Sequence, residues 1–179
     1  MSRIFFTSDS HFFHYNSIRH SNRPYSDVQE MNRTLVDNWN KRVRQEDIVY
    51  HLGDFCWKGL SQTKGILSQL KGKVTLITGN HDKESVVKAG FKEVTSYKVI
   101  KPGGSHIVLF HFPIEVWDRK HYGSIHLHGH SHGTKNSEGL LRMDVGVDCN
   151  NYAPIALEEV LDKMKYKLEN ENIEVKNER

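Results

Sequence analysis

The sequence predicts an α/β fold with mixed sheets, and two observations on the 179-residue chain support this prediction. In the front half, short apolar runs typical of strands alternate with segments whose apolar residues recur every three or four positions, as in helices. In the back half, most apolar runs are strand-like and are separated by turn residues. Strand–helix alternation followed by a series of strands is typical of a layered α/β protein and not of a purely doubly wound one.

Three strands and three helices are expected in the front half. The strands cover residues 4–8, 48–52 and 74–78. We expect the longest helix to begin at Ser26, which serves as its N-cap. One face of that helix carries apolar residues three or four positions apart: Val28, Met31, Leu35, Trp39 and Val43. The next helix is marked by a similar apolar set: Leu60, Ile66, Leu67 and Leu70. A short helix is expected over residues 85–89.

The back half contains an expected hairpin, two more strands and one helix. Residues 94–101 and 106–110 flank Pro102-Gly103-Gly104, and this turn sequence indicates a hairpin. Further strands are expected at 125–128 and 140–147. The last helix is amphipathic, with an apolar face made of Leu157, Val160, Leu161, Met164 and Leu168. We expect one domain over residues 1–179, with a flexible polar tail at 170–179.

Composition excludes several classes of protein. Hydrophobic residues make up 37% and charged residues 26% of the chain, as in globular and not disordered proteins. No apolar stretch reaches the about 18 residues of a membrane span. The first apolar run turns polar at Thr7, too soon for a signal peptide, so we expect a cytoplasmic protein. Cys56 and Cys149 are expected to be free thiols. The net charge of +3 is dispersed and defines no nucleic-acid surface.

Five short segments place potential metal ligands directly after expected strands. They are Asp9-Ser10-His11, Gly53-Asp54, Gly79-Asn80-His81-Asp82, His111 and Gly129-His130-Ser131-His132. Each is common by itself, since Gly-Asp, for example, marks ordinary turns. In α/β sheets, however, ligand sites gather at the carboxyl ends of strands. The joint occurrence of these five segments therefore indicates one shared site.

The order Asp-x-His, Gly-Asp, Gly-Asn-His-Asp, His and Gly-His-x-His resembles the pattern of the calcineurin-like metallophosphoesterase superfamily. The resemblance spans residues 9 to 132, and small bacterial and phage members are also similar around residues 14–24. It implies a four-layer α/β/β/α sandwich with two mixed sheets packed face to face. It also implies an enzyme that hydrolyses phosphoesters with the help of metal ions.

The resemblance further implies two divalent cations with a shared carboxylate. The first would be bound by Asp9, His11, Asp54 and His132. The second would be bound by Asp54, Asn80, His111 and His130. Mixed nitrogen and oxygen ligands suit Mn²⁺, which we favour over Fe, Zn or Ni. Two such ions about 3.5–4 Å apart can clamp a phosphoryl group and activate a bridging hydroxide.

The remaining motif residues would carry out proton transfer and orientation. His81 would be the general acid that protonates the leaving group, and Asp82 would accept a hydrogen bond from its other ring nitrogen. Asn80 would also hold a phosphate oxygen. His14 or Arg23 is expected to contact the substrate, since the guanidinium fork suits phosphate. For Arg23, packing against Tyr25 and the Pro24 turn is an equally good interpretation.

Other histidines and the segment 143–154 are expected to support the site. His51, His126 and His128 are expected in the core or behind the ligands, whereas His20, His106 and His121 are expected at the surface. Residues 143–154 resemble the corresponding stretch of small family members and are interpreted as structural support.

The sequence leaves the substrate open. We expect a phosphodiesterase, because the chain has little room for a capping domain over the site. The alternatives are a phosphomonoesterase and an enzyme that processes nucleotides or nucleic acid, for which Phe12, Phe13, Tyr15, Arg19 and Arg23 are the available residues. An alternative of another class is a non-catalytic interaction module with the same fold. We expect no membrane partner and infer no obligate protein partner.

Overall fold

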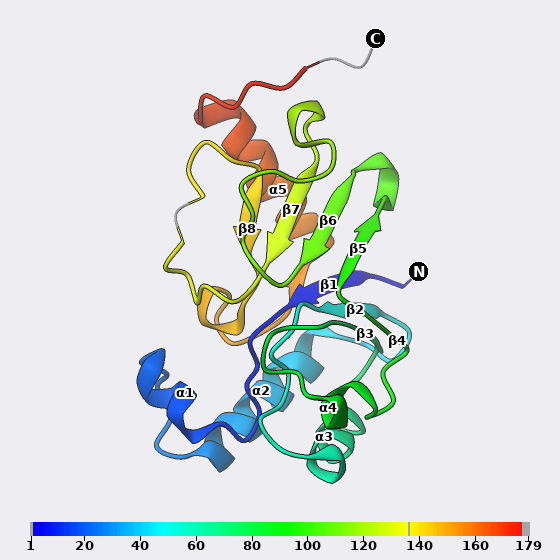
Figure 1. Ribbon diagram of the computed structural model, residues 1–179, viewed down its shortest axis with the longest axis vertical. Helices are drawn as coiled ribbons and strands as arrows, with labels where there is room; N and C mark the ends of the chain where they lie inside the picture. The colour runs from blue at the N-terminus through cyan, green and yellow to red at the C-terminus, as the bar shows by residue number, and fades with distance from the viewer. Residues whose placement is uncertain (1, 136, 177–179) are drawn as a thin grey trace.

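Two mixed β-sheets form the centre of the computed structural model, which describes residues 2–135 and 137–176 (Figure 1). The first sheet has the order β4-β3-β2-β1-β9. Its strands are β1 (Ile4–Thr7), β2 (Ile48–His51), β3 (Lys73–Ile77), β4 (Glu93–Thr95) and β9 (Ile155–Ala156). Strands β1 to β4 are parallel and β9 is antiparallel to β1.

The second sheet has the order β5-β6-β7-β8. Its strands are β5 (Tyr97–Ile100), β6 (Ile107–Phe110), β7 (Ile125–His128) and β8 (Arg142–Asp144). β5 is antiparallel to β6, and β6, β7 and β8 are parallel. An isolated bridge between Ser8 and Gly146 joins the end of β1 to the residues that follow β8. The α/β class with two mixed sheets is therefore confirmed, and the carboxyl ends of β1 and β8 meet.

Five α-helices lie in the described part of the chain. They are α1 (Tyr15–His20), α2 (Val28–Arg42), α3 (Leu60–Leu67), α4 (Glu84–Val87) and α5 (Leu157–Asn170). Three 3-10 turns lie at Pro102–Gly104, Lys120–Tyr122 and Val147–Cys149. In Figure 1, α2, α3 and α4 lie below the first sheet, and α5 runs behind the second. No helix in the described part of the chain is long and apolar enough to cross a bilayer.

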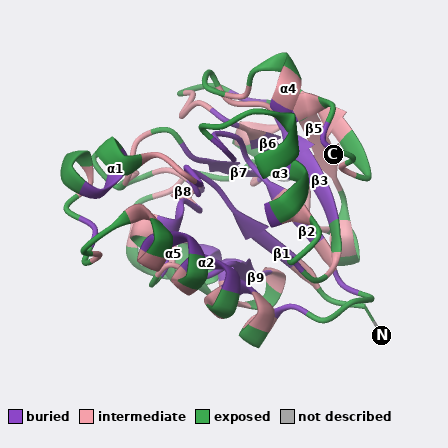
Figure 2. Ribbon diagram, turned by 90° about the horizontal axis from the view of Figure 1, so that it is seen from below, coloured by how far each residue is buried: buried purple, intermediate pink, exposed green. Residues whose placement is uncertain are grey.

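Strand alternation divides the apolar residues between two cores. Successive side chains of a strand point to opposite faces of its sheet. Phe5 of β1 accordingly packs in a core with Met31, Leu35 and other residues of α2, whereas Phe6 packs in a core with residues of the second sheet and α5. Figure 2 shows β1 mostly buried, while α3 exposes much of its surface. The first sheet thus lies between a helical layer and the second sheet.

Three sequence expectations need correction. The N-cap of α2 is Asp27, whose side chain accepts a hydrogen bond from Glu30 N; Ser26 instead donates to the Glu30 carboxylate. Residues 94–101 do not form one strand. The chain breaks at the exposed Ser96, because β4 pairs with β3 in the first sheet and β5 pairs with β6 in the second. Helix α1 and strand β9 were not expected.

The end of the chain is only partly within the described residues. Ile173 packs against the second core, and Lys176 N donates to His121 O. Residues 171–176 are therefore in contact with the domain, whereas 177–179 of the expected tail lie outside the described residues. Cys56 and Cys149 are free thiols, as expected.

Candidate metal centre

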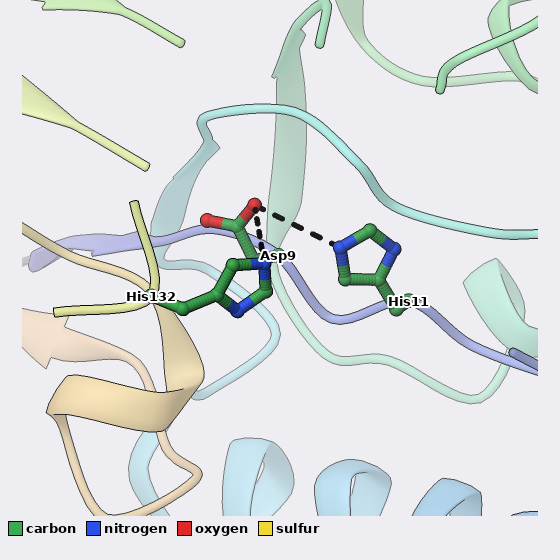
Figure 3. A group of neighbouring side chains, drawn as sticks. All are labelled: Asp9, His11 and His132. Atoms are coloured by element: carbon green, nitrogen blue, oxygen red, sulfur yellow. Dashed lines mark ion pairs between the residues drawn. The ribbon is translucent and has the colours of Figure 1, made fainter. Parts of the chain in front are cut away.

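The first group of converging side chains consists of Asp9, His11 and His132 (Figure 3). Asp9 Oδ1 lies 3.9 Å from the Nε2 atom of each histidine. Asp9 and His11 are buried and follow β1, whereas His132 is half-buried and follows β7. These separations are too long for hydrogen bonds. They fit donor atoms that each lie about 2.0–2.2 Å from one shared cation.

The second group consists of Asp54, His111 and His130. His111 Nδ1 donates a hydrogen bond of 2.6 Å to Leu52 O, and burial lowers the pKa of the His111 ring. The neutral ring therefore presents a lone pair at Nε2. This atom lies 3.6 Å from Asp54 Oδ2 and 3.1 Å from Asn80 Oδ1. Lone pairs from three side chains converge here, which is the arrangement expected around a cation.

Asp54 lies between the two groups. Its Oδ2 atom is 3.7 Å from His11 Nε2 in the first group and 3.6 Å from His111 Nε2 in the second. Its Oδ1 atom accepts a hydrogen bond of 2.9 Å from His81 N, which fixes the carboxylate. A single oxygen of Asp54 is thus within reach of two adjacent cation positions.

The backbone around these residues is held in a conformation that side chains rarely adopt. Five of the expected ligands have positive φ angles between 45° and 66°: Asp9, His11, Asp54, His130 and His132. Such strain persists only where the surrounding structure holds it in place, and it concentrates at functional sites. Gly129 permits the close approach, because a Cβ atom there would lie 2.3 Å from Asp9 Oδ2.

Asp9 provides a test of whether these residues suit a cation. Its Oδ1 atom is buried and has no hydrogen-bond partner. Burial is the main reason why the pKa of this carboxyl is raised to about 8. Burial likewise lowers the pKa of His11 to about 2, so this ring is neutral and able to act as a ligand. A buried, unpartnered carboxylate oxygen beside neutral imidazoles fits a divalent metal ion of the Mn, Fe or Zn type.

His81 lies on the exposed side of the centre, with Nε2 4.0 Å from Asp54 Oδ2. Its ring contacts that of Trp57, with centroids 4.9 Å apart, and Trp57 stacks on His14 at 3.8 Å. Asp82 does not orient this ring, contrary to expectation. Its carboxylate instead accepts three backbone hydrogen bonds, from the N–H groups of Asp54, Phe55 and Gly79.

Arg23 does not lie where it could contact the substrate, as one of the two expectations had it. Its side chain is fully buried, and the guanidinium donates to both carboxylate oxygens of Asp148. It also donates to the backbone oxygens of Asp9 and Ser10. With these donors engaged and no exposed surface, Arg23 has no group left for a phosphate.

The other histidines lie close to where they were expected. His51, His126 and His128 are fully buried. His51 Nε2 shares a hydrogen bond of 2.8 Å with Ser10 Oγ, between two ligand residues. His20 and His121 are exposed, whereas His106 is half-buried and paired with Asp118.

Comparison with known families decides the class of the centre. The family model described as the calcineurin-like phosphoesterase superfamily domain matches residues 2–147. The chain belongs to this superfamily. It is accordingly a metallophosphoesterase, a metal-dependent hydrolase of phosphoesters. The non-catalytic interaction module is therefore set aside.

The similar proteins match most of the chain. Uncharacterized protein MJ1445 of Methanocaldococcus jannaschii is 38% identical over 88% of this chain and 89% of its own length. Gene 66 protein of Mycobacterium phage L5 is 29% identical over 74% of this chain and 78% of its own length. The crystal structure of protein AQ665 of Aquifex aeolicus, described as of unknown function, has a TM-score of 0.74 and 28% identity. The match covers 92% of this chain and 100% of AQ665, so the two proteins share one fold over nearly the whole molecule.

Two residues beside the metallophosphoesterase centre were not singled out from the sequence, although one of them, Asp148, lies in the segment 143–154 that was interpreted as structural support. Trp57 is three positions beyond Asp54, and this closeness to a ligand motif was the signal available in the sequence; its exposure of 44% is visible only in the folded chain. Asp148 belongs to none of the five ligand segments. It accepts a hydrogen bond of 2.6 Å from His132 Nδ1, and only the folded chain brings these two residues together.

Proposed function

We propose that this metallophosphoesterase is a phosphodiesterase with two divalent cations and that His81 is its general acid. Asp9, His11 and His132 would hold one cation, and Asn80, His111 and His130 the other, with Asp54 shared. The observation that carries the proposal is the position of Asp54 Oδ2, 3.7 Å from a ring nitrogen of the first group and 3.6 Å from one of the second. Mn²⁺ is the proposed cation, because the donors are carboxylate, amide and imidazole groups without thiolate.

The bound cations would supply charge neutralisation for the phosphoryl oxygens and a lowered pKa, towards about 7, for a water molecule. The chain's own residues complete the reaction. Asn80 is exposed at the edge of the second group, where its amide nitrogen can donate to a phosphoryl oxygen. The buried carboxylates Asp9 and Asp54 fix the positions of the charges, so little reorganisation is needed when charge develops on the substrate.

His81 is the group best placed to protonate the departing oxygen. Its side chain is 42% exposed, and its Nε2 faces the centre at 4.0 Å from Asp54 Oδ2. A substrate phosphate bound over the shared carboxylate would bring its leaving oxygen to this side. Trp57, and not Asp82, orients the His81 ring in this proposal, because the Trp57 ring packs against the imidazole. Trp57 and the stacked His14 therefore border the space for the leaving group.

The exposed residues on the side of the second group favour a diester over a monoester. Asn80, His81 and His130 are all exposed, so the second ester group of a phosphodiester can extend away from the centre without a clash. The proposed substrate contact of His14 is also on this side. A nucleic-acid or nucleotide diester is a narrower form of the same proposal, for which the exposed Tyr15 and Trp57 offer aromatic surface.

The test is a matrix of metals and substrates on the purified chain. Turnover of bis(p-nitrophenyl) phosphate, p-nitrophenyl phosphate, cyclic nucleotides and single-stranded nucleic acid is measured with Mn²⁺, Zn²⁺, Fe²⁺, Ni²⁺ or chelator. We expect the highest kcat/KM for a diester with Mn²⁺ and no turnover with chelator. A higher kcat/KM for the monoester under every metal would overturn the diester assignment. Diester turnover that persists in chelator would overturn the role of the cations.

A further inference from the structure

Two segments outside the ligand set meet directly beside the first group. Arg23 lies in the loop after α1, and Asp148 lies in the 3-10 turn Val147–Cys149. Arg23 Nε donates to Asp148 Oδ1 at 2.8 Å and Nη2 donates to Oδ2 at 2.9 Å. The side chains are 0% and 7% exposed, respectively. This is a two-pronged, buried ion pair, the geometry in which an arginine and a carboxylate bind each other most specifically.

The same two side chains also contact the residues around the first cation position. Arg23 Nη2 donates to Asp9 O at 2.7 Å, and Arg23 Nη1 donates to Ser10 O at 3.0 Å. On the other side, Asp148 Oδ2 accepts a hydrogen bond of 2.6 Å from His132 Nδ1. One continuous hydrogen-bonded path therefore runs from the backbone of Asp9 through Arg23 and Asp148 to the ring of His132.

This path constrains the two features on which metal binding at the first group depends. Asp9 and His132 both have positive φ angles, 55° and 45°, and such a backbone needs external support. The hydrogen bond from Nδ1 to a carboxylate also fixes the tautomer of His132 and directs Nε2 towards Asp9 Oδ1. The second group is held differently, since His111 Nδ1 donates to the backbone oxygen of Leu52.

We propose that Arg23 and Asp148 are a positioning pair for the first group, Asp9, His11 and His132. The pair holds Asp9 and His132 in place before any cation binds and thereby sets the metal affinity of this group. The pair explains two segments that the catalytic scheme leaves unused, the loop that contains Arg23 and the stretch 143–154. Lysine cannot replace Arg23, because an ammonium group cannot span the Asp148 carboxylate and two backbone oxygens in one plane. The inference rests on the proposed cation sites but not on the phosphodiesterase assignment, since it concerns binding alone.

The experiment measures Mn²⁺ binding to the chelator-treated full chain by isothermal titration calorimetry. Asp148→Asn and Arg23→Lys are compared with the wild type, and His132→Ala and His130→Ala identify which binding step belongs to which group. We expect both pair variants to weaken the first-group step by about 10- to 100-fold, the usual effect of losing a partner of a ligating histidine. The second-group step keeps its affinity. Arg23→Lys preserves the charge, so it remains informative where Asp148→Asn destabilises the fold.

Glu115→Gln is the matched control. It removes the carboxylate that accepts a 3.0 Å hydrogen bond from Arg142, another buried arginine, and Glu115 contacts none of the proposed ligands. The control should bind both equivalents of Mn²⁺ like the wild type. Wild-type affinity at both steps in both pair variants would overturn the inference, as would equal losses at the two steps. If the wild type binds Mn²⁺ but cleaves no diester, the phosphodiesterase proposal fails. The positioning pair is then still judged by the binding steps of its two variants.

Discussion

The two halves of the proposed metal centre both use carboxylate and imidazole side chains but are built differently. The first group has two buried ligands, Asp9 and His11, and its third ligand, His132, is bonded to a buried ion pair. The second group contains the buried His111, but Asn80 and His130 are exposed. A buried, pre-positioned set of donors loses less freedom when a cation binds than an exposed set does. In the proposed two-cation centre, the first half is therefore the more preformed position and the second half is the more open one.

The largest effect should come from the residue that the two halves share. Asp54→Ala removes a ligand from both positions, so the chain should lose both cations and their stabilisation of the transition state. Since a bound metal contributes several kcal/mol, kcat/KM for a diester should fall about 10³-fold or more. The measurement is steady-state turnover with Mn²⁺. A loss of less than tenfold would mean that Asp54 does not join the halves.

Separate variants of the two halves should differ in metal binding. His132→Ala removes a ring from the preformed half, and its Mn²⁺ affinity there should fall by more than about 100-fold, beyond the usual cost of an indirect change. His130→Ala removes an exposed ring whose place water can take, so its loss should be smaller. Calorimetric titration of both variants checks the order. The reverse order would contradict the assignment of the preformed half.

A variant of His81, on the open side, distinguishes an effect on catalysis from an effect on metal binding. His81→Ala should reduce turnover of a diester with a poor leaving group by about 10²–10⁴-fold, the range typical of general acid catalysis. A good leaving group such as p-nitrophenolate needs little protonation, so its turnover should fall much less. The rates of an alkyl ester and an aryl ester are compared, with Mn²⁺ binding as the control. Equal losses on both esters would show that His81 is not the acid.

The smallest effect concerns a buried histidine that is not a ligand. Burial lowers the pKa of His51 from 6.5 to about 3. The folded pKa lies below the unfolded one, so the unfolded chain binds more protons between these values. The stability that neutral His51 contributes is complete above pH 6.5 and is lost as the pH falls towards 3.

The metal-free chain should therefore unfold more easily as acid is added, and His51→Gln should flatten this dependence. One group contributes at most about 1.4 kcal/mol per pH unit. The exposed His121→Gln is the control and should leave the slope unchanged. Thermal unfolding midpoints of the three proteins between pH 4 and pH 7, a range that covers most of the titration and its upper plateau, provide the measurement. Identical slopes for all three would place the acid sensitivity elsewhere.

The sequence predicted the local features of the fold better than those that depend on distant partners. The apolar periodicity of Met31, Leu35 and Trp39 identified α2, since a helix buries residues at that spacing regardless of what covers them. The break at Ser96 was missed, because β4 and β5 are equally strand-like and only their partners in different sheets separate them. Strand β9, two residues long, has no periodicity from which to predict it.

A similar division applies to the candidate site. Asp9, His11 and Asp54 were visible as polar residues at the ends of apolar strands, and the structure places His11 Nε2 within 4 Å of a carboxylate oxygen of both Asp9 and Asp54. For Arg23 the sequence left a substrate contact and a structural role open, because a guanidinium suits a substrate phosphate and a buried carboxylate equally well. Its partner Asp148 is 125 positions away. Sequence spacing carries no information about such a contact.

The most direct test of the central claim is electron paramagnetic resonance of the chain loaded with two equivalents of Mn²⁺. If the two halves share Asp54, the ions lie about 3.5–4 Å apart, close enough for their spins to couple. We predict a coupled two-manganese spectrum that Asp54→Ala abolishes. Two equivalents of bound Mn²⁺ that give only the spectrum of isolated ions would contradict the account.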